Sequence, residues 1–375
     1  MIIGVLKESG SERRVALLPE IVMTLTKMGV SVMVETDAGL KSFASDADYQ
    51  AAGAKTASKK EVITGSDMVL KINPLTDEEL LFISEGKIFM AQFNPLMNHQ
   101  IVKKYAEKNL TSFSLDVIPR TTRAQAMDIL SSMATVNGYK AVLTAANTIP
   151  KFFPMFMTAA GTITPAKILI LGAGVAGLQA IATARKLGGV VHVFDVRAAV
   201  KEEVIGLGGK FVEVEGAVDD KTAGGYAVEQ TEEFRQRQGQ AIHDHAVKMD
   251  VVLCTAQIPG KKAPLLLKKE TVENMKPGAV IIDLAASTGG NCELTKDGET
   301  IEHNGVTIIG NSNFAIDMPS DASKMFGKNI LNFLNLMISK EGVFNLNWED
   351  DLIKGTCVTH NKEIVHERVK SLINQ

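Results

Sequence analysis

Short apolar stretches alternate with amphipathic segments over residues 1–115. Apolar runs of about four or five residues predict buried strands, and apolar residues spaced three and four positions apart predict helices. The predicted strands are residues 2–6, 31–35, 68–72, 87–91 and 111–115. The predicted helices are residues 19–28, 46–52, 59–64, 77–82 and 99–108. Strands and helices that alternate in this way are typical of a parallel α/β layer.

A second strand–helix–strand pattern begins near residue 166 and contains a glycine-rich turn. Residues 167–171 predict a buried strand, residues 175–187 a helix and residues 190–194 a second strand. Gly172, Gly174 and Gly177 lie in the turn that joins the first strand to the helix. The first glycine permits the tight turn, the second lets a pyrophosphate approach the backbone, and the third lets the helix pack against the strand. The helix N-terminus then attracts the phosphates.

An acidic residue completes this dinucleotide-binding fingerprint. Asp195 ends the second strand, about 20 residues after the turn, where a carboxylate accepts hydrogen bonds from ribose hydroxyls. A carboxylate there repels a 2′-phosphate, so NAD(H) is favoured over NADP(H), although Arg197 weakens that preference. The alternative is a Rossmann-like domain whose glycine turn binds no dinucleotide.

Further strands and two long helices define the domain organisation. Residues 211–214, 251–254, 280–283 and 306–309 predict more parallel strands, whereas residues up to 148 and residues 322–338 predict long helices. A second long helix is expected to return the chain to its first domain. We therefore predict an α/β protein with two Rossmann-like domains and parallel sheets. Residues 139–321 form the NAD(H)-binding domain, inserted into a discontinuous first domain of residues 1–138 and 322–375.

A polar segment before the first long helix departs from the regular pattern. Arg120 and Gln125 fall in a loop, and Asp128 and Ser131 share one face of the helix that follows. A carboxylate with a hydroxyl one turn away suits a carboxamide, which has both donors and an acceptor. Equally, these residues are consistent with a capped helix start flanked by surface arginines.

Other segments allow two interpretations each. The glycines before Tyr226, including Gly225, indicate a mobile flap or a surface insertion without a role. Gln257 follows a strand end, where dinucleotide contacts belong. The methionine and phenylalanine run at 152–157 favours core or domain-junction packing over a cofactor site.

Two cationic positions near strand ends also stand out. Arg13 and Arg14 follow the first strand, and they are either anion ligands or solvated loop charges. Lys71 lies inside an apolar strand, and a buried lysine needs a partner or a ligand.

Composition excludes several classes of protein. The net charge is −3 and there is no long basic run, so nucleic acid is not an expected partner. The three cysteines and seven histidines show no metal-ligand spacing, and His243 and His245 point to different helix faces. No signal peptide and no apolar run of about 18 residues occur, so the chain is not expected to span a membrane by itself.

Several motifs together resemble one family over almost the whole chain. They are Glu12-Arg-Arg-Val-Ala-Leu-Leu-Pro19, the 120–132 segment, the glycine turn, Thr222-Ala-Gly-Gly-Tyr226, Ile258-Pro-Gly260, Met275-Lys-Pro-Gly278 and Gly355-Thr-Cys-Val358. The chain resembles the NAD(H)-binding alpha subunit of proton-translocating NAD(P) transhydrogenase, a family related to alanine dehydrogenase.

The resemblance implies a role for each matching residue. Arg120, Gln125, Asp128 and Ser131 would contact the nicotinamide end, and Tyr226 with Gly225 would close over NAD(H). The remaining implied contacts with the dinucleotide are Thr121, Thr122, Gly172, Gly174, Val175, Gly177, Asp195, Val196, Arg197 and Gln257. The family position of Gln257 is more usually aliphatic, so its contact departs from the pattern.

Two positions depart from alanine dehydrogenase. Arg14 and Lys71 match the arginine and lysine with which that enzyme binds its carboxylate substrate. Its histidine and aspartate for proton transfer correspond to Asn94 and Ser287, which do not titrate near neutral pH. Direct hydride transfer between two nicotinamides needs only alignment of the rings and exclusion of water.

The resemblance thus implies an oxidoreductase that passes hydride between NADH and NADP⁺ on a partner subunit, coupled to proton translocation. It implies a homodimer, an NADP(H)-binding subunit and membrane-spanning subunits on separate chains. It places the chain in the cytoplasm, peripheral to the inner membrane. The alternatives are an amino-acid dehydrogenase similar to alanine dehydrogenase and a non-catalytic NAD-binding module.

Overall fold

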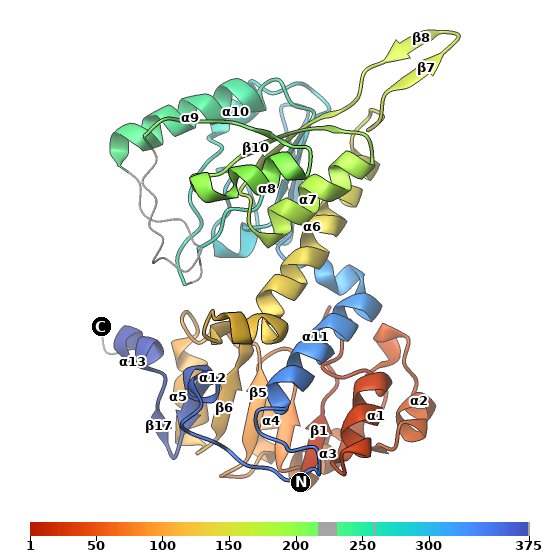
Figure 1. Ribbon diagram of the computed structural model, residues 1–375, viewed down its shortest axis with the longest axis vertical. Helices are drawn as coiled ribbons and strands as arrows, with labels where there is room; N and C mark the ends of the chain where they lie inside the picture. Colours follow the sequence, from red (N-terminus) through yellow and green to blue (C-terminus); the bar gives the residue numbers. More distant parts are fainter. Residues whose placement is uncertain (217–230, 259, 374–375) are drawn as a thin grey trace. The chain divides into compact units, whose positions relative to one another are not determined.

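The computed structural model describes residues 1–216, 231–258 and 260–373, and these fall into two compact units (Figure 1). The first unit comprises Met1–Met133 and Ile316–Gln375, and the second comprises Ala134–Ala315. The second unit is therefore inserted into the first along the chain. Helix α6 (Ile129–Thr148) contains the first of the two boundaries.

The first unit contains an eight-stranded sheet in the order β17-β16-β6-β5-β4-β1-β2-β3. Six of these strands are parallel, whereas β16 and β17 add to one edge in antiparallel pairing. The strands are β1 (Ile2–Val5), β2 (Ser31–Glu35), β3 (Lys55–Ala57), β4 (Met68–Leu70), β5 (Ile88–Ala91), β6 (Thr111–Ser114), β16 (Cys357–His360) and β17 (Glu363–Ile364).

Helices of the first unit start where the sequence supplies a cap or a proline. Ser45, Ser58 and Thr76 each form a capping box, and prolines begin two other helices. The helices are α1 (Pro19–Lys27), α2 (Asp46–Ala51), α3 (Lys59–Gly65), α4 (Asp77–Phe82), α5 (His99–Glu107), α11 (Pro319–Leu334), α12 (Asp351–Thr356) and α13 (Glu367–Ile373).

The second unit contains a seven-stranded sheet in the order β11-β10-β9-β12-β13-β15-β14, parallel except for β14. The strands are β9 (Lys167–Leu171), β10 (Val190–Phe194), β11 (Lys210–Phe211), β12 (Val251–Cys254), β13 (Val280–Asp283), β14 (Thr300–His303) and β15 (Val306–Gly310). The helices besides α6 are α7 (Val175–Lys186), α8 (Lys201–Gly206), α9 (Glu232–Ala246) and α10 (Lys269–Glu273).

Both faces of this second sheet are covered, which explains its continuous apolar strands. Alternate side chains of a strand point to opposite faces. Ile168 and Ile170 of β9 belong to one hydrophobic cluster, and Leu169 and Leu171 belong to the other. All four side chains are buried, as expected for a parallel sheet with helices on both sides. The structure confirms two Rossmann-like α/β units with largely parallel sheets.

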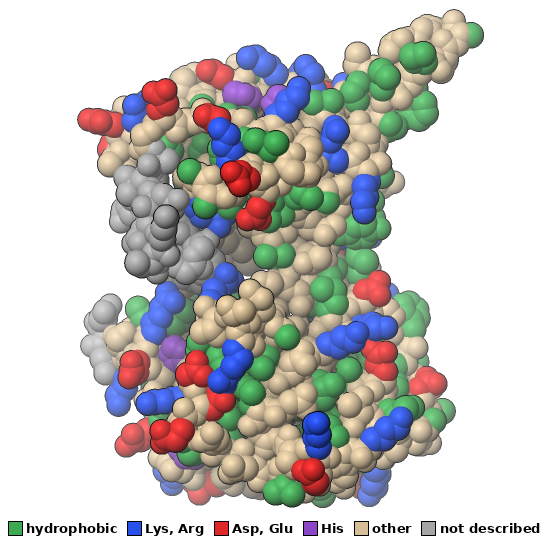
Figure 2. Space-filling model, in the orientation of Figure 1, with side chains coloured by type: hydrophobic (Ala, Val, Ile, Leu, Met, Phe, Trp, Pro, Cys, Tyr) green, Lys and Arg blue, Asp and Glu red, His purple; other side chains and the backbone are tan. Residues whose placement is uncertain are grey.

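The apolar run at 152–157 does not pack as predicted. Only Phe153 enters the core, whereas Phe152 is 54% exposed and Met157 is 77% exposed. The run leads into a separate hairpin of β7 (Phe156–Thr158) and β8 (Gly161–Ile163), which extends away from the rest of its unit (Figure 1). Hydrophobic side chains line this hairpin on the surface (Figure 2). Packing in the core was therefore the wrong prediction for most of the run, whereas packing at a domain junction stays a prediction.

No helix among the described residues has both the length and the apolar content needed to cross a bilayer.

Candidate functional site

The glycine turn lies at the topological switch point of the second sheet. Strand β9 has β10 on one side and β12 on the other, and ligands of such sheets bind beyond the strand ends at this point. Gly172 has a φ of +104°, and Thr255 Oγ1 lies 2.7 Å from the position that a β-carbon would take. At Gly177 a β-carbon would lie 2.0 Å from the carbonyl oxygen of Gly172. Both positions therefore require glycine for the protein's own packing.

Gly174 differs from its two neighbours. It caps α7 with extended backbone, and a β-carbon there would meet no atom of residues 1–216, 231–258 and 260–373 within 4 Å. The space above the helix N-terminus is therefore open, next to backbone N–H groups that have no partner within a helix. An anionic group such as a pyrophosphate fits this position by charge and by space.

Gly138 is a packing position that the sequence did not indicate. A β-carbon on Gly138 would lie 2.1 Å from the carbonyl oxygen of Ala176. Helix α6 therefore contacts the first turn of α7 through backbone atoms. A glycine inside a long predicted helix is the signal that could have identified this close approach.

Asp195 is fully hydrogen-bonded within the chain. Its Oδ2 accepts from the Ala173 N–H (2.7 Å) and from Arg197 Nη2 (2.7 Å). Its Oδ1 accepts from Nε and from the backbone N–H of Arg197, both at 2.9 Å. These four donors match the four lone-pair positions of a carboxylate. A ribose hydroxyl can bond to Asp195 only by displacing a donor, and the Arg197 side chain is the one that can rotate away.

Hydrogen bonds connect two loops beyond the strand ends: the first bonds to the glycine turn, and the second bonds to the first. Thr255 donates its hydroxyl to the carbonyl oxygens of Gly172 (2.9 Å) and Leu171 (3.2 Å). The buried side chain of Asn291 bonds both the N–H and the carbonyl oxygen of Ala256. The backbone N–H of Asn291 in turn donates to Asp283 Oδ2 at 2.8 Å. These contacts fix the walls beside the turn, and sequence reasoning did not assign Thr255, Asp283 or Asn291.

Other residues predicted for the dinucleotide also lie in this unit. Val175 begins α7 and is 41% exposed, and Val196 lies between Asp195 and Arg197. Gln257 is exposed and donates from Nε2 to the carbonyl oxygen of Leu284 at 3.0 Å. Gly225 and Tyr226, predicted for a flap, lie outside the described residues.

The polar loop of the first unit begins a helix with a local cap. Asp128 comes directly before α6, and its two carboxylate oxygens accept from the backbone N–H (2.9 Å) and the hydroxyl (2.6 Å) of Ser131. The structure therefore shows the capped helix start that was one of the two interpretations of this pair. A role toward a carboxamide stays a prediction.

Exposed side chains precede this cap. Residues 122–127 form a 3₁₀ helix, Thr122–Met127, in which Ala124 and Met127 are buried and Gln125 is exposed. Arg120, Thr121 and Thr122 are exposed as well. The loop thus brings Arg120 and Gln125 onto the surface of the first unit beside Asp128 and Ser131.

Arg14 lies in a buried polar network near the end of β1. Its Nε and Nη2 donate to the two oxygens of Glu12 at 2.8 and 2.6 Å, and its Nη1 faces the Met133 sulfur at 3.0 Å. Burial alone would raise the pKa of Glu12, but the hydrogen bonds and charge of Arg14 lower it overall. The arginine is thus neither a solvated loop charge nor unpaired.

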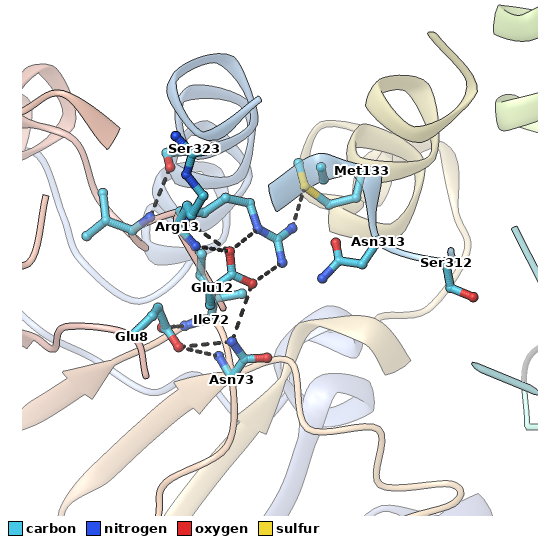
Figure 3. A network of polar contacts seen from close by, with 12 residues as sticks. Glu8, Glu12, Arg13, Ile72, Asn73, Met133, Ser312, Asn313 and Ser323 are labelled. Atoms are coloured by element: carbon cyan, nitrogen blue, oxygen red, sulfur yellow. Dashed lines mark hydrogen bonds and ion pairs between the residues drawn. The ribbon is translucent and has the colours of Figure 1, made fainter. Parts of the chain in front are cut away.

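Asn73, which the sequence did not single out, also belongs to this network (Figure 3). Its Nδ2 lies 3.0 Å from Glu8 Oε2 and 3.5 Å from Glu12 Oε2. Glu8 Oε1 in addition accepts the Ile72 N–H at 2.5 Å. Burial raises the pKa of Glu8 to about 7, although Lys71 and these donors lower it.

Lys71 has its partner within the chain. Its Nζ lies 2.8 Å from Glu79 Oε2, and both side chains are fully buried. Burial raises the pKa of Glu79, but Lys71, the Thr76 N–H and Lys59 lower it overall. The ammonium also donates to the Pro74 carbonyl oxygen at 3.4 Å, so groups of the chain itself use two of its three N–H donors.

The two positions that match the proton-transfer residues of alanine dehydrogenase hold neutral side chains in exposed settings. Asn94 has a φ of +47°, and its backbone N–H donates to Asp116 Oδ2 at 2.9 Å. Asp116 also accepts the Ser114 hydroxyl, and burial raises its pKa. Ser287 is exposed, and its backbone N–H donates to the Ser312 hydroxyl. Neither side chain can donate and regain a proton near pH 7.

Glu8 is expected to make the stability of the protein depend on pH. The folded-state pKa lies above the ordinary value of 4.5, so the folded chain binds more protons than the unfolded chain between pH 4.5 and about 7. The free energy of unfolding should fall across this interval by about 3 kcal/mol at most, at about 1.4 kcal/mol per pKa unit, and then level off. Urea unfolding from pH 5 to 8 should show this slope in the wild type and not in Glu8→Gln. Equal slopes in both proteins would refute the assignment.

No group of three or more histidine, cysteine or acidic side chains suited to a metal ion occurs within the described part of the chain.

A parallel sheet with an open glycine turn at its switch point and an acidic residue at the next strand end defines a Rossmann-type dinucleotide-binding domain. The chain belongs to the alanine dehydrogenase/PNT family. The family's N-terminal domain matches residues 4–137 and its C-terminal domain matches residues 141–367.

Relatives that are named transhydrogenase match this chain at higher identity than relatives that are named alanine dehydrogenase. The chain is 45% identical to an NAD(P) transhydrogenase subunit alpha polypeptide of Rhodospirillum rubrum, over 95% of each chain. A crystal structure of transhydrogenase from Sinorhizobium meliloti superposes with a TM-score of 0.89 at 40% identity, covering 97% of this chain and all of that one. An L-alanine dehydrogenase structure superposes with a TM-score of 0.81 at 24% identity over 100% of this chain and 99% of that one, and it shares the fold.

Proposed function

We propose that this chain is the NAD(H)-binding subunit of a proton-translocating NAD(P) transhydrogenase. Hydride passes directly between NADH held by this chain and NADP⁺ held by a partner subunit. The observation that carries the proposal is the combination of an open dinucleotide turn at Gly174 with neutral residues at both proton-transfer positions, Asn94 and Ser287. The 45% identity to a transhydrogenase alpha subunit supports the same assignment.

The residues of the second unit fit NAD(H) by charge and by space. The N-terminus of α7 at Gly174 would hold the pyrophosphate, with Gly172 and Gly177 shaping the turn. Asp195 would accept the adenosine ribose hydroxyls once the Arg197 side chain turns away. The dinucleotide, when bound, supplies the hydride; the chain itself supplies binding and orientation.

The loop of the first unit would orient the reacting ring. Gln125 is exposed and can offer an amide donor and acceptor to a carboxamide. Asp128 and Ser131 already bond to each other, so we assign them first to holding the start of α6. Arg120 would act from the same loop, and Tyr226 would help to exclude water. No step of direct hydride transfer requires an acid or base on this chain.

Oxidation of an amino acid makes different demands on the same fold. It requires a group that exchanges protons with the substrate, and Asn94 and Ser287 cannot do this. It also requires a cation for the substrate carboxylate, whereas Lys71 is bonded to Glu79. These observations favour the transhydrogenase over an amino-acid dehydrogenase.

A reconstitution experiment tests the proposal. The purified chain is mixed with the NADP(H)-binding partner subunit, NADH and an NADP⁺ analogue, and reduction of the analogue is followed by absorbance. We expect reduction that requires both proteins, and no NADH formation from L-alanine and NAD⁺. Absence of transfer would favour a non-catalytic NAD-binding module, and oxidation of L-alanine would favour the dehydrogenase.

Gln125→Asn should slow hydride transfer far more than it weakens NADH binding. The substitution keeps the amide but withdraws it by one methylene, and small displacements of an aligned reactant cost about 10-fold to 100-fold in rate. We expect a loss of that size with a dissociation constant for NADH within about twofold of wild type. The matched control is Gln100→Asn, at an exposed glutamine of α5. Equal losses in rate and in affinity would remove the positioning role of Gln125.

The proposed assembly contains a second copy of this chain, an NADP(H)-binding subunit and membrane-spanning subunits that carry the proton path. The chain would then act at the cytoplasmic face of the inner membrane. The β7–β8 hairpin supports self-association, because its unpaired strand edges carry exposed Phe156, Met157 and Ile163. The apolar residues at 331–337 are less suited to such a contact, because Phe333, Leu334 and Met337 are buried within the chain's own first unit.

A further inference from the structure

Three asparagines at intervals of three residues lie on α11 and at its C-cap, and the two within the helix contact the polar loop. The Nδ2 atoms of Asn329 and Asn332 donate to the same acceptor, the carbonyl oxygen of Ala126, at 2.8 and 2.9 Å. The side chain of Asn335 makes no hydrogen bond with any of the described residues. The three amides are chemically alike, so the structure singles out two of them by their contact with one backbone atom.

That backbone atom lies next to the residue with the proposed nicotinamide role. A carbonyl oxygen has two lone pairs, and the two amides occupy both of them. Ala124 and Met127, on either side of Gln125 and Ala126, are 2% and 7% exposed. The exposed Gln125 side chain therefore projects from a backbone that is fixed by burial and by hydrogen bonds.

Asn329 combines a bonded donor with a buried acceptor that has no partner among the described residues. It is 6% exposed, and its Oδ1 accepts no hydrogen bond within residues 1–216, 231–258 and 260–373. A buried acceptor without a partner carries a desolvation penalty. An apolar residue would avoid this penalty but could not donate to Ala126. The arrangement thus favours a fixed loop over maximal stability.

A second anchor holds the same loop from the C-terminal segment. Arg123 forms ion pairs with Asp350 and with Asp351, the latter at 3.3 Å. Asp350 also caps α12 through the N–H groups of Leu352 and Ile353. The loop is therefore tied to two elements that come about 200 residues later in the chain.

We propose that Asn329 and Asn332 are positioning residues for hydride transfer, which hold the backbone at Ala126 so that Gln125 keeps its orientation toward the nicotinamide. This role rests on the proposed transhydrogenase function. It predicts that loss of the donors affects the rate of transfer, because alignment of the rings determines the rate, and leaves the affinity for NADH largely intact.

The test compares Asn332→Asp and Asn332→Ala with the matched control Asn335→Ala. The aspartate keeps the shape of asparagine but replaces the donor with an acceptor that repels the Ala126 carbonyl oxygen. Hydride transfer is measured in the mixture with the NADP(H)-binding partner, NADH affinity in the chain alone, and amide hydrogen exchange over residues 120–128. We expect both variants to transfer hydride about 10-fold more slowly, with NADH affinity within about twofold and faster exchange confined to the loop.

Three outcomes would overturn the proposal in distinguishable ways. If the wild type is active and the Asn332 variants transfer hydride at the same rate, the positioning role of the asparagines is refuted and the proposed function stands. An equal loss of NADH affinity in the Asn332 variants would show that the effect on transfer is a general structural one. An equal loss of transfer in the control Asn335→Ala would show the same. A wild-type chain that transfers no hydride to the partner's nucleotide would refute the proposed function and this role with it.

Discussion

Gly174→Val is expected to abolish measurable NADH binding while leaving the protein folded. A β-carbon at this position meets no atom of the described part of the chain within 4 Å, and the backbone is extended, so valine fits there. The added side chain would occupy the space proposed for the pyrophosphate. We expect the dissociation constant for NADH to rise at least about 100-fold, or about 2.8 kcal/mol. The free energy of unfolding should change by about 1 kcal/mol or less, the cost of a poor N-cap. Fluorescence titration with NADH and urea unfolding measure the two quantities.

Gly206→Val is the matched control for this experiment. Gly206 also has open space around its β-carbon position, but it ends α8 instead of the nucleotide turn. Gly177→Ala should instead lower the stability of the fold, because its β-carbon would lie 2.0 Å from a backbone oxygen. Wild-type affinity for NADH in Gly174→Val would place the pyrophosphate elsewhere and contradict the assigned site.

Lys71→Met should give the largest loss of stability. Lys71 and Glu79 are both fully buried and lie 2.8 Å apart, and removal of one partner leaves the other charge without compensation. We expect the free energy of unfolding to fall by about 3–5 kcal/mol. Lys59, at 3.4 Å from Glu79 Oε1, offsets part of this loss. Urea unfolding at pH 7 gives the value directly.

The double variant Lys71→Met/Glu79→Gln separates the charge from packing. Glutamine keeps an oxygen that can accept the Thr76 N–H, which Glu79 Oε2 accepts at 2.8 Å. The double variant should therefore recover much of the stability that the single variant loses. A single variant within about 1 kcal/mol of wild type would show that this pair adds little to stability.

Periodicity predicted the elements that are marked by a local sequence signal, such as a buried apolar run or a helix cap. The strands at 31–35, 251–254 and 280–283 and the helix at 77–82 were predicted with the bounds of β2, β12, β13 and α4. In β12 and β13 all four residues are buried, and in the helix a Thr76 capping box marks the start. Such local signals do not depend on contacts with distant parts of the chain.

Elements whose apolar residues are exposed were not predictable in the same way. The 152–157 run has the composition of a core segment, yet it leads into the exposed β7–β8 hairpin. Hydrophobicity alone cannot distinguish a residue buried within one chain from a residue left on its surface for another contact. Strands β16 and β17 were missed for a different reason, because they are short and add to the edge of an existing sheet.

The glycine turn was predictable because each glycine satisfies a local steric condition, and Gly172 and Gly177 meet those conditions in the structure. Contacts between distant residues were not. The predicted helix at 322–338 contains Asn329 and Asn332, but the sequence could not show that both donate to Ala126, about 200 residues earlier. Likewise, Asp195 was assigned to ribose, whereas its present partners are Ala173 and Arg197.

The central claim is that this chain holds a hydride donor for another nucleotide and not for a small substrate. An isotope experiment tests it most directly: NADH labelled with deuterium at the transferring position of C4 is mixed with this chain, the partner subunit and an NADP⁺ analogue. Direct transfer without acid–base chemistry predicts that the deuterium appears in the reduced analogue and does not exchange with water. Solvent hydrogen at the transferring position of the product would contradict the account. In a second mixture with pyruvate and ammonia, deuterium on the α-carbon of newly formed alanine would contradict it as well.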